Sequence, residues 1–205
     1  MDEDVAGLGL RERKKRATYQ ALADAAFELS VERGPDAVTV EDIAAAADVS
    51  PRTFFNHFES KEQAILARNT ARWARAPRLL ADRPDDEDIW TALGHTFRAI
   101  YAGEAQERTL LATLAMVRQS ANLLSRQRDE YEAAEELLVG EVARRTGTRA
   151  DDLHPRLVVA TAIAAARVAV RRWIEEDADD PVELAVAHAL DQVAAGLPAP
   201  LPTTA

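Results

Sequence analysis

The stretch TVEDIAAAADVSPRTFFNHFESK at residues 39–61 decides the fold. Thr39 is a good helix N-cap, and Ser50, followed by a proline, marks the start of a second helix. Asp48 stands at the turn between them, where a left-handed backbone is needed that Asp tolerates better than most residues. Ser60 lies three residues before a glutamine, the spacing of a capping box at the start of a third helix. The pattern therefore predicts a helix-turn-helix, a motif that reads DNA.

The second helix of this motif is one to two turns long, and its faces differ in chemistry. Phe54 and Phe58 are one turn apart and are predicted to face the core. The predicted outward face, near the N-terminus where a recognition helix meets base edges, carries the polar residues Arg52, Thr53, Asn56 and His57. An arginine there matches the two acceptors on the major-groove edge of guanine.

The charge of the chain is distributed unevenly. The net charge of −10 is unusual for a protein that binds DNA, but most of the acidic excess lies after residue 80. The only dense basic cluster lies at residues 11–16, just before the motif, and we take Arg11 and Lys14 within it as phosphate contacts. An acidic remainder would confine contact with DNA to one end of the molecule.

The rest of the chain predicts an all-α fold of about nine helices. Ala, Leu, Glu and Arg are abundant, and alternating β-branched runs are few. The first helix is expected at residues 10–33, ending at Gly34, and Pro77 should break or kink the helix that starts at Lys61. We expect a three-helix DNA-binding domain at residues 10–60 and a larger helical domain for ligand binding and dimerisation at 61–196. Residues 1–9 and 197–205 are expected to be disordered.

Several classes of function find no support in the composition. The chain has no cysteine, which excludes disulfides and thiolate metal sites and is typical of a cytoplasmic protein. It has no long apolar run for a membrane span and no signal peptide at its acidic N-terminus. The four histidines lie on separate predicted helices, and no phosphate-binding loop or nucleophile elbow occurs. We therefore expect that the protein is not an enzyme and that it binds no cofactor, no metal ion and no membrane.

The basic-headed first helix followed by VTVEDIAAAADVSPRTFFNHFESKE resembles the DNA-binding domain of TetR-family transcriptional regulators. The match covers about residues 11–66. The later segments DDLHPRLVVATAIAAARVAVRRWIEED and DQVAAGL look like a subgroup that includes mycofactocin-system regulators, which are thought to sense long-chain acyl-CoA. The resemblance implies an obligate homodimer, a ligand cavity in the second domain, and release from a double-stranded DNA operator when a hydrophobic small molecule binds.

The resemblance also assigns residues by position. In this family's pattern the DNA-contacting positions fall on Thr39, Ser50, Arg52, Thr53, Asn56, His57 and Lys61. A cation gains nothing from the dipole at a helix N-terminus, so a phosphate contact would explain Lys61. Phe55 stands where many members carry a tyrosine that contacts a phosphate, and Asp48 replaces a common glycine.

The second domain supplies two further sets of candidate residues. The expected ligand-binding residues are Trp73, Trp90, Phe97, Tyr101, Leu114, Val117 and Tyr131. The helix expected at residues 152–175 is apolar on more than one face. This indicates that one face packs against its own domain and another face packs against a second copy of the chain. The expected interface residues of that helix and the last one are Val159, Ile163, Ala166, Val170, Val186 and Leu190.

Two other interpretations remain open at the level of sequence. One is a regulator of the same fold that senses a drug or antibiotic and controls an efflux gene. The other is an architectural DNA-binding protein without an effector, which a fully packed second domain would favour. A repressor that senses an acyl-CoA is the interpretation that the resemblance favours.

Overall fold

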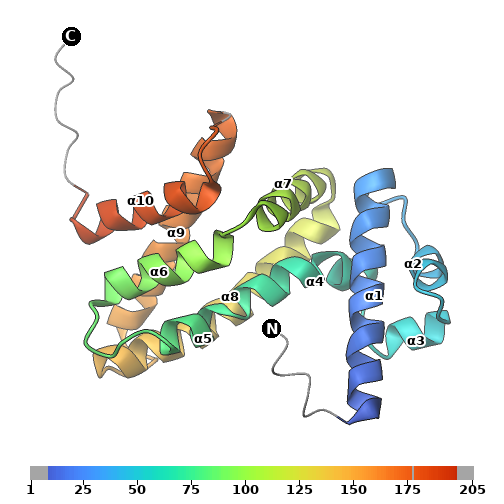
Figure 1. Cartoon of the computed structure of the whole chain (residues 1–205), viewed down its shortest axis with the longest axis horizontal. Coiled ribbons are helices and arrows are strands. Elements are labelled where there is room, and N and C mark those ends of the chain that lie inside the picture. Colours follow the sequence, from blue (N-terminus) through green and yellow to red (C-terminus); the bar gives the residue numbers. More distant parts are fainter. Residues whose placement is uncertain (1–8, 177, 198–205) are drawn as a thin grey trace. The chain divides into compact units, whose positions relative to one another are not determined.

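The computed structural model describes residues 9–176 and 178–197, and within these residues the fold is all-α, as predicted. Apart from Gly9 and Leu197, the ends that were expected to be disordered lie outside the described residues. The helices are α1 (Leu10–Arg33), α2 (Val40–Ala46), α3 (Pro51–Phe55), α4 (Lys61–Trp73), α5 (Ala76–Ala81), α6 (Ile89–Tyr101), α7 (Glu104–Gln119), α8 (Ala121–Thr146), α9 (Leu153–Glu175) and α10 (Val182–Ala194) (Figure 1).

The break expected at Pro77 accounts for one helix more than the predicted nine. Proline cannot donate to the preceding turn, and the chain leaves the α4 helix at Trp73 and resumes as α5 at Ala76. Pro77 then occupies an early position of α5, where its missing N–H costs nothing. The predicted start and end of the first helix agree with α1, which ends at Gly34 with φ of 85°.

The chain forms two compact units whose boundary runs through helices. One unit contains the chain up to Ala71 together with Thr109–Glu130, and we call it the head. The other contains Arg72–Arg108 and the chain from Tyr131 onward, and we call it the body. The head therefore includes most of α7 and the first part of α8, in addition to the segment that was expected to form the DNA-binding domain.

The core of the head joins helices from distant parts of the sequence. In Figure 1, α1 runs alongside the short helices α2 and α3. Phe54 of α3 is completely buried, and so are Leu22 of α1 and Ile43 of α2. Val117 of α7 and Leu123 of α8 belong to the same apolar cluster. Burial of such side chains stabilises a fold by about 1.5–3 kcal/mol each.

In the body, α10 packs against both α6 and α9, and α5 packs against α6 (Figure 1). The buried side chains Leu93 of α6, Val159 of α9 and Leu190 of α10 contribute to this packing. No helix in the described part of the chain combines the length and apolar character that a membrane crossing needs.

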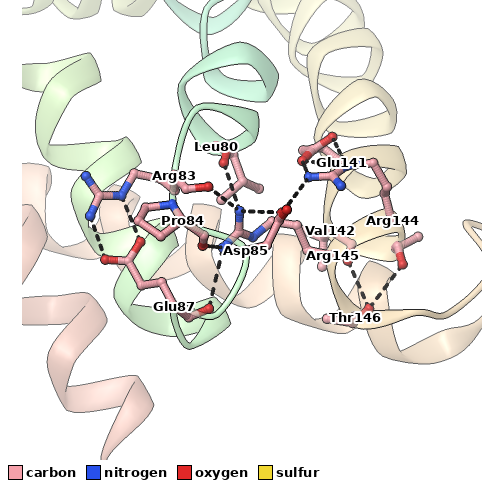
Figure 2. Close-up of polar contacts among 11 residues, drawn as sticks. Leu80, Arg83, Pro84, Asp85, Glu87, Glu141, Val142, Arg144, Arg145 and Thr146 are labelled. Atoms are coloured by element: carbon pink, nitrogen blue, oxygen red, sulfur yellow. Dashed lines mark hydrogen bonds and ion pairs between the residues drawn. The ribbon is translucent and has the colours of Figure 1, made fainter.

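A buried arginine organises the loop between α5 and α6. The side chain of Arg145, at the end of α8, is only 3% exposed. Its guanidinium donates to the backbone carbonyls of Leu80, Arg83, Pro84 and Glu87 at 2.5–3.4 Å (Figure 2). The loop thus folds around a fixed cation, which adds a charged donor to carbonyls of the loop and of the end of α5.

Candidate DNA-binding and effector sites

Side-chain caps hold the two helices of the helix-turn-helix in place. At the start of α2, the Thr39 hydroxyl accepts from the Asp42 N–H at 3.1 Å, and the Asp42 carboxylate accepts from the Thr39 N–H at 3.0 Å. The Thr39 hydroxyl also donates to the Asp42 carboxylate at 2.6 Å, and this bond, together with the one from the Thr39 N–H, lowers the pKa of Asp42. At the start of α3, the Ser50 hydroxyl accepts from the Thr53 N–H at 3.1 Å. Asp48 has a φ of 53°, the left-handed conformation expected at the turn. The predicted caps and turn are confirmed.

The cap before α4 differs by one residue from the predicted box. The Ser60 hydroxyl accepts from the Gln63 N–H at 3.3 Å, as expected. The Gln63 side chain, however, accepts from the N–H of Glu59 at 2.7 Å rather than from that of Ser60. The side chain reaches one residue further back, so it pairs the backbone of the turn that follows α3.

The helix α3 ends at Phe55, so Asn56, His57 and Phe58, which were predicted to lie on it, belong to its C-cap and to the turn that follows. The buried and exposed side chains nevertheless divide as predicted. Phe54 and Phe58 are 0% and 2% exposed, and they pack with ring centroids 5.6 Å apart. Arg52 and Asn56 are exposed, whereas Thr53 and His57 are half-buried. Phe55 is 59% exposed, so an aromatic ring stands at the surface beside the polar face.

Two of the four polar residues on this face have partners within the chain. The Thr53 hydroxyl is hydrogen-bonded to that of Ser50 at 2.9 Å. The His57 ring lies 6.4 Å from the ring of Tyr19 on α1, and Tyr19 also stacks on Phe58 at 4.5 Å. Tyr19 could not be predicted from the sequence as a support of this face, because it lies on α1, far from α3 along the chain. Arg52 and Asn56 are the more accessible pair.

Lys61 lies at the start of α4, and its ammonium is directed at backbone carbonyls. The Nζ atom donates to the carbonyls of Pro35 at 2.9 Å and Val38 at 2.8 Å, and to that of Asp36 at 3.4 Å. An ammonium has three N–H donors, and here each has a carbonyl within reach. The side chain therefore supports the loop that leads into α2, a role that the sequence analysis did not foresee.

The basic cluster near the N-terminus lies on the first turns of α1. Arg11 and Lys14 are exposed, as is every described residue from Gly9 to Ala17. The buried face of α1 begins only at Leu22. The cluster is thus a solvent-facing helical segment, which is the geometry that a phosphate contact requires.

In the body, three aromatic rings gather around one tryptophan. Trp73, at the end of α4, has ring centroids within 5.6 Å of Phe97, 6.2 Å of Tyr101 and 5.6 Å of Tyr131. The Arg72 guanidinium lies over the Tyr101 ring at 4.9 Å. Burial raises the pKa of Tyr101 to about 12, so its hydroxyl remains protonated. The indole N–H of Trp73 is buried without an acceptor, although buried donors are normally paired.

The other residues expected at a ligand site are not part of this cluster. Trp90 is half-buried near the start of α6. Leu114 and Val117 lie on the part of α7 that belongs to the head, and Val117 packs in the core of the head. Four of the seven expected residues are therefore brought together around Trp73, and these four carry the aromatic rings of the cluster.

A groove of about 780 Å³ lies between α9 and α10. Six alanines contribute to its lining, and three larger apolar residues are well exposed there: Val168 at 60%, Leu184 at 42% and Leu197 at 66%. His188 and Gln192 of α10 line the groove and are hydrogen-bonded to each other at 3.1 Å. Exposed apolar surface of this kind marks a site where another surface binds.

The residues expected at the dimer interface lie on other faces of these helices. Val159, Ala166, Val170, Val186 and Leu190 are each at most 6% exposed and pack within the chain, and Ile163 is half-buried. Their side chains are therefore largely covered within the chain itself. The exposed stripe of α9 instead includes Thr161, Val168 and Arg172. Thr161 and Arg172 are three turns apart on this stripe, and in the sequence these polar residues distinguish it from the buried face.

Among the described residues, no group of three or more His, Cys, Asp and Glu side chains is arranged to hold a metal ion.

Comparison with known proteins identifies the family. The family model for bacterial regulatory proteins of the tetR family matches residues 22–67, and the model of the MftR C-terminal domain matches residues 87–198. The chain is 35% identical over 198 residues to the HTH-type transcriptional regulator TcmR of Streptomyces glaucescens, covering 91% of this chain and 87% of TcmR. The chain belongs to the TetR family.

Solved structures of TetR-family regulators share the fold. FadR of Bacillus subtilis in complex with stearoyl-CoA matches with a TM-score of 0.62 and 19% identity, over 87% of this chain and 98% of FadR. The SmeT–triclosan complex matches with a TM-score of 0.62 and 22% identity, over 91% of this chain and 99% of SmeT. At these identities the likeness concerns the fold alone.

Membership of the TetR family fixes the class of function. The chain is a DNA-binding transcriptional regulator and not an enzyme. TetR-family regulators act as dimers with small-molecule effectors. The helix-turn-helix of the head falls within the region matched by the tetR-family model, and the groove between α9 and α10 falls within the region matched by the MftR model.

Proposed function

We propose that this chain is a repressor that binds a pseudo-palindromic operator as a homodimer and releases it when an effector binds. The observation that carries the proposal is the exposed polar face formed by α3 and its C-cap, where Arg52 and Asn56 are accessible. The Ser50 side chain caps the N-terminus of this helix. Each copy places α3 in a major groove. Such a function implies the cytoplasm as the location of the protein.

The proposed contacts with DNA fall into two groups. Arg52, Thr53, Asn56 and His57 face base edges, with Arg52 as the main reader. Thr39, Ser50, Arg11 and Lys14 meet phosphates, which fix the position of the head but carry no sequence information. We assign Lys61 to the support of the loop before α2 rather than to a phosphate, because its ammonium is held by carbonyls.

The groove between α9 and α10 supplies the proposed dimer interface. Its exposed Val168 and Leu184 would be covered by the same groove of a second copy, as the two-fold symmetry of a homodimer requires. The alanine-rich lining allows two helices to approach closely. Two heads held by one interface then read two half-sites, separated by about 34 Å or a multiple of that distance.

The aromatic cluster around Trp73 is the proposed effector site. Its rings suit an apolar ligand, and the unpaired indole N–H of Trp73 is a donor for an acceptor group on that ligand. Long-chain acyl-CoA is the first candidate, since the similar FadR structure is a complex with stearoyl-CoA. A drug-like aromatic molecule is the second candidate, since the similar SmeT structure is a complex with triclosan. A protein without an effector is the third interpretation.

Arg52→Ala tests the reading role of α3. A bidentate contact to guanine contributes about 1–3 kcal/mol, so operator affinity should fall about 5- to 150-fold, and one operator position should lose its base preference. The operator is first selected from random DNA, and binding is then measured by titration against all four bases at each position.

Arg13→Ala is the matched control, since it removes the same charge from an exposed position outside α3. It should weaken binding equally at all sequences and leave the base preferences intact. Unchanged base preference in Arg52→Ala would remove this residue from the proposed reader.

Effector titrations separate the three interpretations of the body. Stearoyl-CoA should raise the melting temperature and lower operator affinity if the acyl-CoA assignment holds, and Trp73→Phe, which lacks the indole N–H, should weaken both effects. Triclosan acting in place of stearoyl-CoA would favour the drug interpretation. If neither compound changes either quantity, and native mass spectrometry of the purified protein finds no retained ligand, the effector-free interpretation is favoured.

A further inference from the structure

The start of α8 belongs to the head and is attached to it at three separate places. Ser120, the residue before α8, is only 4% exposed, and its hydroxyl donates to the Asp36 carboxylate at 2.8 Å. Asp36 lies in the loop between α1 and α2, the same loop whose carbonyls hold Lys61. A buried side chain at the start of α8 thus holds the segment that leads into the helix-turn-helix.

The second attachment reaches the turn that follows α3. Arg126 of α8 forms an ion pair with Glu59 at 3.6 Å and another with Glu130 at 3.3 Å. The Glu59 side chain is 81% exposed, so this pair contributes little free energy on its own. The pair is relevant mainly because it connects α8 to the turn between α3 and α4, of which Glu59 is part.

The third attachment reaches α4. The Thr70 hydroxyl donates to the Glu130 carboxylate in a short hydrogen bond. The Glu130 side chain is 11% exposed, and this burial raises the pKa of Glu130. Burial of a carboxylate costs free energy unless hydrogen bonds compensate. Thr70 and Arg126 supply that compensation from two directions, which fixes where Glu130 lies.

These polar attachments surround an apolar contact on the same side of α8. Leu123 is completely buried in the core that also contains Phe27 and Phe54. Residues 123, 126 or 127, and 130 recur at helical spacing, so they share one face of the helix. That face contacts segments before α2, after α3 and within α4, which are the segments that determine where α3 lies.

We propose that Ser120, Arg126 and Glu130 are positioning residues for DNA reading, which hold α2 and α3 on the first turns of α8 so that two heads of a dimer keep a fixed half-site separation. The inference rests on the proposed binding of a two-half-site operator. The helix α8 contributes residues to both the head and the body.

The double variant Ser120→Ala/Arg126→Ala tests the proposal in the full-length protein. Amide hydrogen exchange should become about five- to tenfold faster at residues 34–40 and 56–63, because each attachment contributes a modest part of the local opening free energy. Exchange in α9 and α10 should not change. The matched control is Ser125→Ala/Arg128→Ala, which removes the same groups from exposed positions of the same helix and should leave exchange as in the wild type.

A second measurement distinguishes positioning from general stability. The affinity for the selected operator is compared with that for the same operator carrying one extra base pair at its centre. The ratio of the two affinities is the penalty for altered spacing. This ratio should fall about tenfold in the double variant, because a less firmly held head tolerates a misplaced half-site. Asp36→Asn, which keeps the acceptor for Ser120, should retain the wild-type penalty, whereas Asp36→Ala should reduce it.

The outcomes separate this inference from the proposed function. Unchanged exchange at residues 34–40 and 56–63 in the double variant would overturn the inference, and so would an unchanged spacing penalty. Absence of any selected operator for the wild type would contradict the proposed function, while the exchange result would still decide whether α8 holds the head.

Discussion

Val168→Asp should convert the protein from a dimer to a folded monomer and weaken operator binding by about 100-fold or more. Val168 is 60% exposed in the groove between α9 and α10, so a carboxylate there costs little in the isolated chain. In the proposed dimer it would lose its water and face its own symmetry copy, because an isologous interface repeats each contact. Two half-sites bound together gain about 10²–10⁴ in affinity over one, and a monomer loses that gain.

Sedimentation equilibrium measures the mass of the variant, circular dichroism its helix content, and titration its operator affinity. Leu137→Asp is the matched control, since Leu137 is 63% exposed on α8 and does not line the groove. The control should remain dimeric and bind the operator as the wild type does. A dimeric Val168→Asp variant, or dissociation caused by Leu137→Asp, would show that another face forms the interface.

Arg145→Ala should lower the free energy of unfolding by about 3–5 kcal/mol, because several carbonyls lose a buried, charged donor and the shortened side chain leaves a cavity. The carbonyls of Leu80, Arg83, Pro84 and Glu87 would lose the guanidinium as a donor, although those of Leu80 and Pro84 keep a backbone N–H, and a cavity would replace the guanidinium. For a chain of this size the melting temperature should fall by about 10 °C.

Arg144→Ala is the control for this prediction. Arg144 is the neighbouring residue, but its side chain is 52% exposed, and its partners Glu141 and Asp85 are 13% and 83% exposed. Its removal should cost less than about 1 kcal/mol. Both variants are compared at one protein concentration, because a dimer's stability depends on concentration. Equal melting temperatures of the two variants would contradict the structural role assigned to Arg145.

The features that were predictable from the sequence are governed by local chemistry. Thr39 and Ser50 cap helices through groups three residues away, and the positive φ of Asp48 follows from its place in a tight turn. Phe54 and Phe58 were assigned to the core by helical spacing alone, and both are buried. The family resemblance and the all-α fold followed from these same residues and are confirmed.

The features that were not predictable depend on contacts between distant residues. Lys61 binds carbonyls of residues 35–38, and Ser120 binds Asp36, so neither partner can be read from a local pattern. The faces of α9 were difficult for another reason. Because apolar residues occur around most of this helix, periodicity does not tell which face packs inside and which remains exposed. Only the observed burial of the residues of α9 shows which face is exposed, and we therefore place the proposed interface on the stripe that contains Val168.

The central claim is that two copies of α3 read two half-sites of one operator. Hydroxyl-radical footprinting of the wild-type protein on its selected operator tests this most directly. The account predicts two protected backbone segments related by a two-fold axis, with centres about 34 Å, or about 10–10.5 base pairs, apart or a multiple of this. A single protected segment, or protection without two-fold symmetry, would contradict it.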